Sequence, residues 1–231
     1  MTLLHEHRAI VASAEPPCIA IFGALKRDTG GPGVEPFELA LSDNAGRLVP
    51  VTDRHLGDAE LLTEFSRWRA ENSFAFPTQF PVSNEGTARW LRHGLLEVRD
   101  RMLFLVQASD GTLIGHLGYA NCLAVPGEME IDNVVRGVKG GAPGIMETAM
   151  RRITSWAVEA FAPDLIHLRV FSHNEHAIRF YERCEFVTVG QLPLRRTEVG
   201  DRITFTPPVP DDTAPPDAWF TRMVLQRRGM M

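Results

Sequence analysis

The sequence contains few of the residues that mark secreted or metal-binding proteins. Among its 231 residues are only three cysteines, Cys18, Cys122 and Cys184, which lie far apart and without CxxC spacing. An odd and scattered set of this kind predicts neither a disulfide framework nor a zinc site. We therefore expect free thiols that are buried or partly buried, and no bound metal.

Clusters of positive charge are also missing. The chain has 24 Lys and Arg against 29 Asp and Glu, a formal net charge of −5, and its cations are spread along the whole sequence. Proteins that bind nucleic acids need clustered Lys and Arg to neutralise phosphates. We therefore expect no nucleic-acid partner. Hydrophobic residues at 44% and charged residues at 23% are typical of a soluble globular protein.

Long hydrophobic runs are the third absence. No apolar run approaches the roughly 18 residues that cross a bilayer. The first 14 residues contain charges and His, and they lack the apolar centre of a signal peptide. The expectation is a cytoplasmic protein with no membrane partner.

The chain is expected to divide into an N-terminal extension, residues 1–46, and a main domain, residues 47–231. Within the extension, Cys18–Gly23 and Phe37–Leu41 are predicted to be short strands, and Asp28–Gly33 is rich in turn residues. The extension either packs on the main domain or trails from it.

From residue 48 onward, alternating and helical hydrophobic patterns predict a mixed α/β domain. The order of elements implies a mixed, largely antiparallel sheet with helices on both faces, and not a doubly wound sheet. Strands are expected at Leu48–Thr52, Met102–Ala108, Leu113–Asn121, Glu128–Val135, Leu165–Phe171, Phe186–Leu192 and Trp219–Leu225, and helices at Leu56–Ala70, after the cap residue Ser83, at Ile145–Phe161 and at Asn174–Cys184.

A glycine-rich turn between a strand and the clearest helix is the first candidate binding site. Consecutive backbone N–H groups at such a turn, together with the positive end of the helix dipole, bind a pyrophosphate, and glycines allow close approach of the anion. A tight connection without a ligand would show the same pattern. The candidate residues are Arg136, Gly137, Lys139, Gly140, Gly141, Ala142 and Gly144, of which Arg136 and Lys139 add positive charge.

The segment from Leu168 to Phe186 carries a more specific pattern. It resembles the L-x-V-x-x-x-N-x-x-A-I-x-x-Y-E-x-x-G-F signature of the GNAT superfamily of N-acetyltransferases. One position departs from the signature: Cys184 is assigned to the place where the family has Gly, which predicts a modified end of the helix. The resemblance covers about residues 48–226 and implies the GNAT fold, whose sheet is splayed between its fourth and fifth strands.

The resemblance also implies acetyl-CoA, or another acyl-CoA, as cosubstrate and a direct attack of a neutral amine on its thioester in a ternary complex. The glycine-rich turn then holds the CoA pyrophosphate. A backbone N–H near Val134 or Val135 polarises the thioester carbonyl, Tyr181 is the candidate general acid for the leaving thiolate, and Asn174 contacts the pantetheine arm or caps the helix. Tyr181 as a simple aromatic filler is the alternative.

The general base is less well defined by the sequence. Glu128, Glu130 and Asp132 alternate along one strand, and Glu130 is the first choice, with Asp132 next. His116 on the neighbouring strand has a suitable intrinsic pKa, although a lone strand histidine is more often structural. A chain of water molecules would serve instead of any of them.

The expected acceptor is a primary amine of a small molecule. Trp68-Arg69, followed by Trp90 and Leu91, is similar to acetyltransferases of the amino-sugar branch, which act on nucleotide-linked sugars. Acceptor contacts are expected from the loop at residues 74–81 and from a hairpin at residues 195–205, whose arginines suit a diphosphate.

Other interpretations stay open. Acceptors of the same enzyme class are a protein N-terminus, an antibiotic or a polyamine. An interpretation of another class is a catalytically degenerate GNAT fold that serves as a binding or interaction module. The N-terminal extension could mediate homodimerisation or cover the acceptor site.

Overall fold

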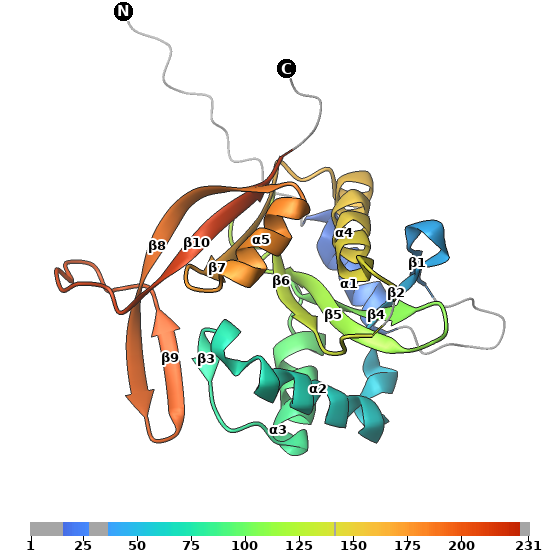
Figure 1. Ribbon diagram of the computed structural model, residues 1–231, viewed down its shortest axis with the longest axis horizontal. Coiled ribbons are helices and arrows are strands. Elements are labelled where there is room, and N and C mark those ends of the chain that lie inside the picture. Colours follow the sequence, from blue (N-terminus) through green and yellow to red (C-terminus); the bar gives the residue numbers. More distant parts are fainter. Residues whose placement is uncertain (1–15, 28–36, 141, 227–231) are drawn as a thin grey trace, which may run out of the picture.

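The computed structural model describes residues 16–27, 37–140 and 142–226, which build one ten-stranded sheet with helices on both faces (Figure 1). The strands are β1 (Leu39–Ala40), β2 (Gly46–Pro50), β3 (Thr78–Gln79), β4 (Met102–Ala108), β5 (Leu113–Ala120), β6 (Glu128–Arg136), β7 (Leu165–Phe171), β8 (Phe186–Val199), β9 (Arg202–Thr206) and β10 (Ala218–Leu225). The helices are α1 (Pro17–Lys26), α2 (Ala59–Glu71), α3 (Asn84–Arg89), the π-helical η4 (Trp90–Leu96), α4 (Ile145–Phe161) and α5 (Glu175–Arg183), with 3-10 turns η1 (Ser42–Asn44), η2 (Asp53–Gly57) and η3 (Ser73–Ala75).

The order of strands in the sheet is β1-β2-β4-β5-β6-β7-β10-β8-β9-β3. All neighbouring strands are antiparallel except β6 and β7, which run parallel. The predicted fold class, a mixed and largely antiparallel sheet, is therefore confirmed. The parallel pair follows from the crossover helix α4, which returns the chain to the same end of the sheet.

The helices form one layer on each face of the sheet. Helices α1, α4 and α5 pack on one face, and α2, α3 and η4 pack on the other (Figure 1). Strand β4 contributes to both cores, because Phe104 and its period-two neighbours point to the α4 side while Leu103 and Leu105 point to the α2 side. This burial on both faces explains why β4 is almost entirely apolar.

The prediction of a strand at Cys18–Gly23 is wrong, because these residues lie in helix α1. Cys18, Ile19 and Phe22 are buried at helical spacing and join the core on the α4 side, where the Phe22 ring stacks on Tyr119. A short apolar run does not distinguish a strand from a buried helix, and tertiary packing decides between them. The turn expected at residues 28–33 lies outside the described residues.

The end of helix α5 also differs from the prediction. Cys184 has φ −88, and the residue in the left-handed conformation is Glu185, with φ 71. Counting along the signature from Tyr181, the glycine position falls on Glu185 and not on Cys184. A left-handed residue directly after the helix is where glycine is usual, so Glu185 adopts this conformation at a conformational cost.

The sheet opens between β6 and β7. The paired residues of these two strands stop at Ile131 and Leu168, although β6 continues to Arg136. On its other side, β6 has a bulge opposite β5, where the register shifts and Asn133 takes φ 52. A bulge of this kind bends a strand and redirects its side chains. The bulge thus lies just beyond the last residue of β6 that pairs with β7, so the strand bends where the sheet opens.

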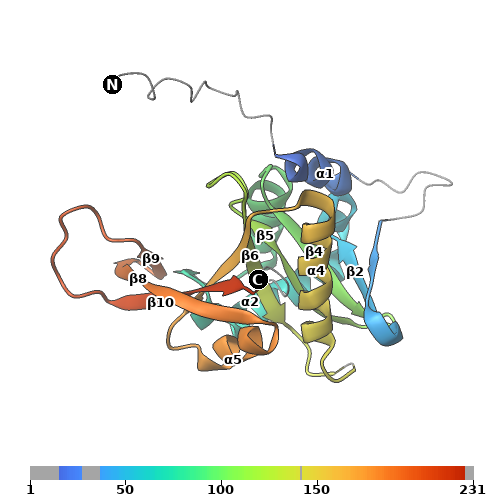
Figure 2. The ribbon, with the colours of Figure 1, turned by 90° about the horizontal axis from the view of Figure 1, so that it is seen from above.

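The second half of β8 leaves the main sheet. Its residues from Phe186 to Leu194 pair with β10, and those from Arg195 pair with β9, so the β8–β9 hairpin projects to one side (Figures 1 and 2). There β9 pairs with β3, which ties the loop after α2 to the hairpin. The strand expected at Phe186–Leu192 is thus longer than predicted.

Cysteine placement and helix lengths agree with the composition. Cys18, Cys122 and Cys184 are buried free thiols. Burial raises the pKa of the Cys184 thiol to about 12, so this thiol stays protonated at neutral pH. Within the described residues, no helix has both the length and the apolarity that a membrane span requires.

Candidate active site

A groove of about 600 Å³ lies where β6 ends and helices α4 and α5 begin, and we call it the α4–α5 groove. It brings together parts of the chain that the sequence analysis singled out separately. The predicted residues on its wall are Val134, Val135, Arg136, Lys139, Gly144, Asn174 and Tyr181. Phe74 and Ala75, from the loop predicted to contact the acceptor, lie on this wall, as does Ala177 of the signature. The wall is completed by residues that were not predicted: Asn72, Met146, Glu147, His176, Phe180 and Arg183.

The start of helix α4 faces this groove. Gly144 precedes the helix with φ 76, and the space beside its Cα is open for at least 4 Å. Both Gly144 and the first-turn residue Met146 line the groove. The Ile145 N–H donates to Ala142 O at 3.2 Å, and the N–H groups of the next two residues, Met146 and Glu147, have no partner within the helix and suit an anion in the groove. Lys139 adds positive charge on the same wall, which suits a pyrophosphate.

The glycine-rich turn itself has an internal order that the sequence did not reveal. The guanidinium of Arg136 donates to the carbonyl oxygens of Val138, Lys139 and Gly140 at 3.1–3.2 Å and so holds the turn together. The N–H of Gly137 donates to Ile114 O at 2.8 Å. A Cβ at Gly137 would lie 2.0 Å from the Trp68 indole. Gly137 therefore has a packing role.

The other predicted residues of the turn lie apart from the groove. Gly140 and Ala142 are not on its wall. Gly141 lies outside the described residues.

Asn174 and Tyr181 occupy opposite ends of α5. The Asn174 side chain accepts a hydrogen bond from Ala177 N at 3.2 Å, which makes it the helix N-cap. Tyr181 is buried, two residues before the end of α5 at Arg183. Burial and the charge of nearby Asp132 raise the pKa of Tyr181 well above its usual range, so its hydroxyl is protonated at neutral pH. A protonated hydroxyl in the groove is a proton donor.

A second cavity, of about 420 Å³, lies on the α2 side of β6, and we call it the β6 pocket. Neighbouring residues of β6 line the two cavities: Asp132 and Asn133 line the pocket, and the next residue, Val134, lines the groove. The remaining lining residues are Phe65, Arg69, Phe76, Pro77, Thr78, Phe80, Val82, Gly86, Thr87, Trp90, Arg101, His116, Asn121, Glu130, Arg169 and Arg202.

Glu130 reaches the β6 pocket with both carboxylate oxygens already bonded. Arg169 donates to them at 2.8 and 3.0 Å, and the Asn121 amide donates at 2.7 Å. The carboxylate is buried, with 6% of the residue exposed. A bidentate ion pair of this kind, with the Asn121 amide beside it, engages both oxygens and fixes the orientation of the carboxylate.

Asp132 has a different environment. The Asn133 amide donates to Asp132 Oδ2 at 2.6 Å. Desolvation raises the pKa of Asp132 above the usual range, and the charge of Arg101 opposes this shift. The negative charge of Asp132 acts on both Tyr181 and Arg69. Asp132 lines the β6 pocket and, unlike Glu130, is held by no ion pair among the described residues, so its position suits the acceptance of a proton.

His116 supports the bulge of β6. Its Nδ1–H donates to Asn133 O at 2.7 Å, and its ring packs edge-on against Phe65. Burial lowers the pKa of His116 to about 4, so the ring is neutral at physiological pH. A neutral, buried imidazole bonded to the backbone at the bulge has a structural role, and its basicity is low.

The arginines expected from the hairpin separate into two groups. Arg195 is held by Asp212, with which it makes a bidentate ion pair, and Arg196 is paired with Glu198. Only Arg202 lines the β6 pocket, near the ring of Phe80. Arg69 enters the same pocket from α2. Strand β3 lies in the loop at residues 74–81 and pairs with β9 of the hairpin. The two segments that were expected to contact the acceptor therefore lie side by side.

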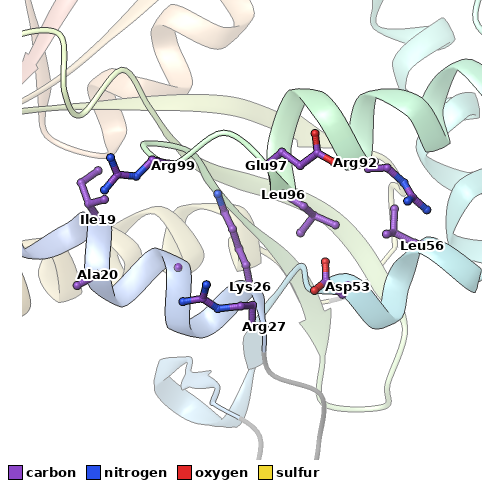
Figure 3. Close-up of a pocket in the computed structure, with 11 residues that line it drawn as sticks. Ile19, Ala20, Lys26, Arg27, Asp53, Leu56, Arg92, Leu96, Glu97 and Arg99 are labelled. Atoms are coloured by element: carbon purple, nitrogen blue, oxygen red, sulfur yellow. The ribbon is translucent and has the colours of Figure 1, made fainter.

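A third cavity, of about 510 Å³, lies between α1, η2 and η4 (Figure 3). No residue of β6, α4 or α5 lines it, so it is separate from the groove and the pocket. Lys26 in its wall donates to Leu95 O at 2.9 Å and to Val98 O at 2.5 Å, which caps the end of η4. Among the described residues, no group of three or more His, Cys, Asp or Glu could hold a metal ion.

Comparison with known proteins identifies the family. Residues 47–187 match the acetyltransferase (GNAT) domain. No curated protein matches the chain in a sequence search.

Solved structures share the fold at low sequence identity. A probable acetyltransferase (GNAT family) from Chromobacterium violaceum has 19% identity and a TM-score of 0.60, covering 83% of this chain and 88% of that one. The spermidine N-acetyltransferase from Vibrio cholerae, in complex with CoA and spermine, has 16% identity and a TM-score of 0.56, covering 77% and 93%. A dodecameric structure of spermidine N-acetyltransferase from the same organism has 16% identity and a TM-score of 0.51, covering 77% and 91%.

Proposed function

This chain belongs to the GNAT family of acetyltransferases, and we propose that it transfers an acetyl group from acetyl-CoA to a primary amine of a small molecule. The single observation that carries the proposal is that neighbouring residues of β6 line the two cavities, Asp132 and Asn133 the β6 pocket and Val134 the α4–α5 groove. The groove supplies a place for the donor, and the pocket supplies a place for the acceptor. The donor and the acceptor then approach each other at β6, as a direct transfer in a ternary complex requires.

Acetyl-CoA supplies an activated thioester, and the α4–α5 groove has the features to hold it. The open N-terminal end of α4 beside Gly144 suits the pyrophosphate, with Lys139 as additional positive charge. Asn174, at the start of α5, lies where the pantetheine arm would pass toward β6. Val134 lies beyond the last residue of β6 that pairs with β7 and has no partner on β5, whereas Val135 pairs with His116, so the Val134 N–H is the one proposed to polarise a carbonyl.

Asp132 and Tyr181 are the proposed proton-transfer pair. The Asp132 carboxylate accepts a proton from the incoming ammonium group, because a protonated amine has no lone pair for the attack. The Tyr181 hydroxyl donates its proton to the departing thiolate. Asp132 lines the β6 pocket and Tyr181 lines the α4–α5 groove, so the base lies on the acceptor side and the acid on the donor side. Glu130, the first choice from sequence, becomes a positioning residue that holds Arg169.

The acceptor class is a separate part of the proposal. The amino-sugar branch was favoured by the sequence, and the structures of similar fold include spermidine acetyltransferases. Both acceptors are primary amines and both fit a pocket of about 420 Å³. We also propose that the protein forms a homodimer, and light scattering of the purified protein would test this.

A calorimetric titration tests the donor half of the proposal. Acetyl-CoA is titrated into the wild-type protein and into Lys139→Glu, which reverses a charge on the groove wall. Arg47→Glu changes the net charge equally on β2, outside the groove, and is the matched control. We expect binding by the wild type and the control, with at least roughly tenfold weaker binding by Lys139→Glu. Absence of binding by the wild-type protein contradicts the proposal and favours the interaction module.

A further inference from the structure

We propose that the acceptor carries an anionic group, a carboxylate or a phosphate, close to its reacting amine. This inference rests on the proposed function and specifies its substrate class. It comes from the charges in the β6 pocket, which are six in number: Arg69, Arg101, Arg169, Arg202, Glu130 and Asp132.

Two of these charges cancel. Arg169 and Glu130 form the bidentate ion pair described above, and Arg169 is thereby occupied. Within the described part of the chain, Arg69, Arg101 and Arg202 take part in no ion pair. Asp132 is the remaining carboxylate. The pocket therefore has an excess of positive charge, with one negative charge at its β6 end.

Arg69 is the best-placed of the three arginines. Its guanidinium lies 3.4 Å from the centre of the Phe76 ring and donates to Thr78 O at 2.6 Å. These two contacts fix the plane of the guanidinium and use only one of its five N–H donors. Burial lowers the pKa of Arg69 to about 10, which shows how incompletely its charge is compensated. A fixed guanidinium with free donors matches the geometry of a carboxylate or phosphate.

Arg202 extends the same surface from the hairpin. Its guanidinium lies 5.8 Å from the Phe80 ring, and that ring also lies 5.5 Å from the Arg69 guanidinium. Both arginines thus approach one aromatic side chain from different elements, α2 and β9. An anion beside Phe80 would be within the field of both.

This charge pattern discriminates between acceptor classes. An acceptor with one amine and one anion places the amine by Asp132 and the anion by Arg69. A polyamine would place its further ammonium groups against the arginines, where like charges repel. An amino acid, or an amino sugar that carries a phosphate, is therefore expected to be a better acceptor than spermidine.

The test compares acceptors that differ only in the anionic group. One pair is an α-amino acid and its amide, the other is a phosphorylated amino sugar and the unphosphorylated sugar, and spermidine is a fifth acceptor. We measure thiol release from acetyl-CoA and, independently of turnover, calorimetric binding of each compound to the CoA-loaded protein. We expect the anionic member of at least one pair to be preferred by at least tenfold, and the responding pair distinguishes carboxylate from phosphate.

Variants of two arginines on the same helix complete the test. Arg69→Gln should remove the preference by raising KM for the anionic acceptor, with acetyl-CoA affinity unchanged. Arg69→Lys keeps the charge but not the fork and should retain part of the preference. Arg67→Gln is the matched control, because Arg67 is exposed and paired with Glu64 and Glu71. Thermal melts of each variant verify folding.

Two outcomes overturn the inference. One is that the neutral member of both pairs, or spermidine, is bound and acetylated as well as the anionic acceptors or better. The other is an Arg69→Gln variant that keeps the full preference. Either result, with acetyl-CoA binding intact, contradicts only the substrate class. Loss of acetyl-CoA binding by the wild type contradicts the proposed function itself.

Discussion

Gly137→Ala should destabilise the protein through a single contact. A Cβ at this position would lie 2.0, 2.1 and 2.3 Å from three atoms of the Trp68 indole, whereas ordinary contacts begin at 3.4 Å. The two groups would have to separate by more than 1 Å, since 3.4 minus 2.0 is 1.4 Å. Trp68 is fully buried between Phe65 and His116, and Gly137 N is bonded to Ile114 O, so neither side moves freely.

The expected magnitude follows from overpacking. Forcing an extra methyl group into a packed core costs about 1–3 kcal/mol. For a protein of this size, each kcal/mol lowers Tm by about 2–4 °C, so the melt should shift by about 2–12 °C. Because Gly137 opens the turn that leads into the α4–α5 groove, acetyl-CoA affinity should fall as well.

Gly140→Ala is the matched control in the same turn. A Cβ at Gly140 meets nothing closer than the Val138 Cγ1 atom at 3.7 Å, so the substitution is accommodated. The assay is thermal denaturation of both variants and the wild type, followed by circular dichroism. Melting temperatures of the two variants that agree within about 1 °C would refute the packing argument, since overpacking acts at only one of the sites.

Three further predictions concern proton transfer and burial. Tyr181→Phe should lower kcat by roughly 10²–10⁴ with acetyl-CoA affinity retained, and an unchanged kcat in steady-state kinetics rejects the acid role. Asp132→Asn should lower kcat/KM by a similar factor. Glu130→Gln should mainly lower the free energy of unfolding, by roughly 1.5–3 kcal/mol, because hydrogen bonds to Arg169 are lost. An equal loss of activity in both variants would make Glu130 a candidate base again. Burial lowers the pKa of Lys26 from 10.5 to about 8, so the unfolded chain binds more protons between these values and stability should rise with pH across this window. Urea denaturation should show this rise in the free energy of unfolding for the wild type and not for Lys26→Met. An equal rise in both proteins would contradict the attribution of the pH dependence to Lys26.

Much of the main domain could be predicted because its patterns are local. The helix at Ile145–Phe161 and the strands at Met102–Ala108 and Leu165–Phe171 agree with the structure in both bounds. Each has an unbroken hydrophobic period and ends at a residue with a clear conformational preference. The cap role of Asn174 is also local, since the side chain bonds a backbone N–H three residues later.

The errors arose where local patterns are ambiguous or where a partner is distant. Helix α1 was predicted to be a strand because a short apolar run fits both periods, and only contact with the α4 side of the core selects the helix. Strand β8 was predicted too short because the strand at Phe186–Leu192 and the hairpin at residues 195–205 were treated as separate, whereas one continuous strand pairs first with β10 and then with β9. The left-handed residue after α5 was assigned one position too early, at Cys184 instead of Glu185.

The candidate site shows the same division between sequence and structure. The family, the position of the glycine-rich turn and the place of Tyr181 on a short helix could be read from the sequence, because these lie in contiguous motifs. The difference between the two carboxylates came from the three-dimensional fold. Glu130 and Asp132 stand two residues apart on one strand, and an arginine from β7 pairs with the first while burial raises the pKa of the second. The charge of the β6 pocket also depends on the fold, since Arg69 and Arg202 come from distant segments that the pairing of β3 with β9 brings together.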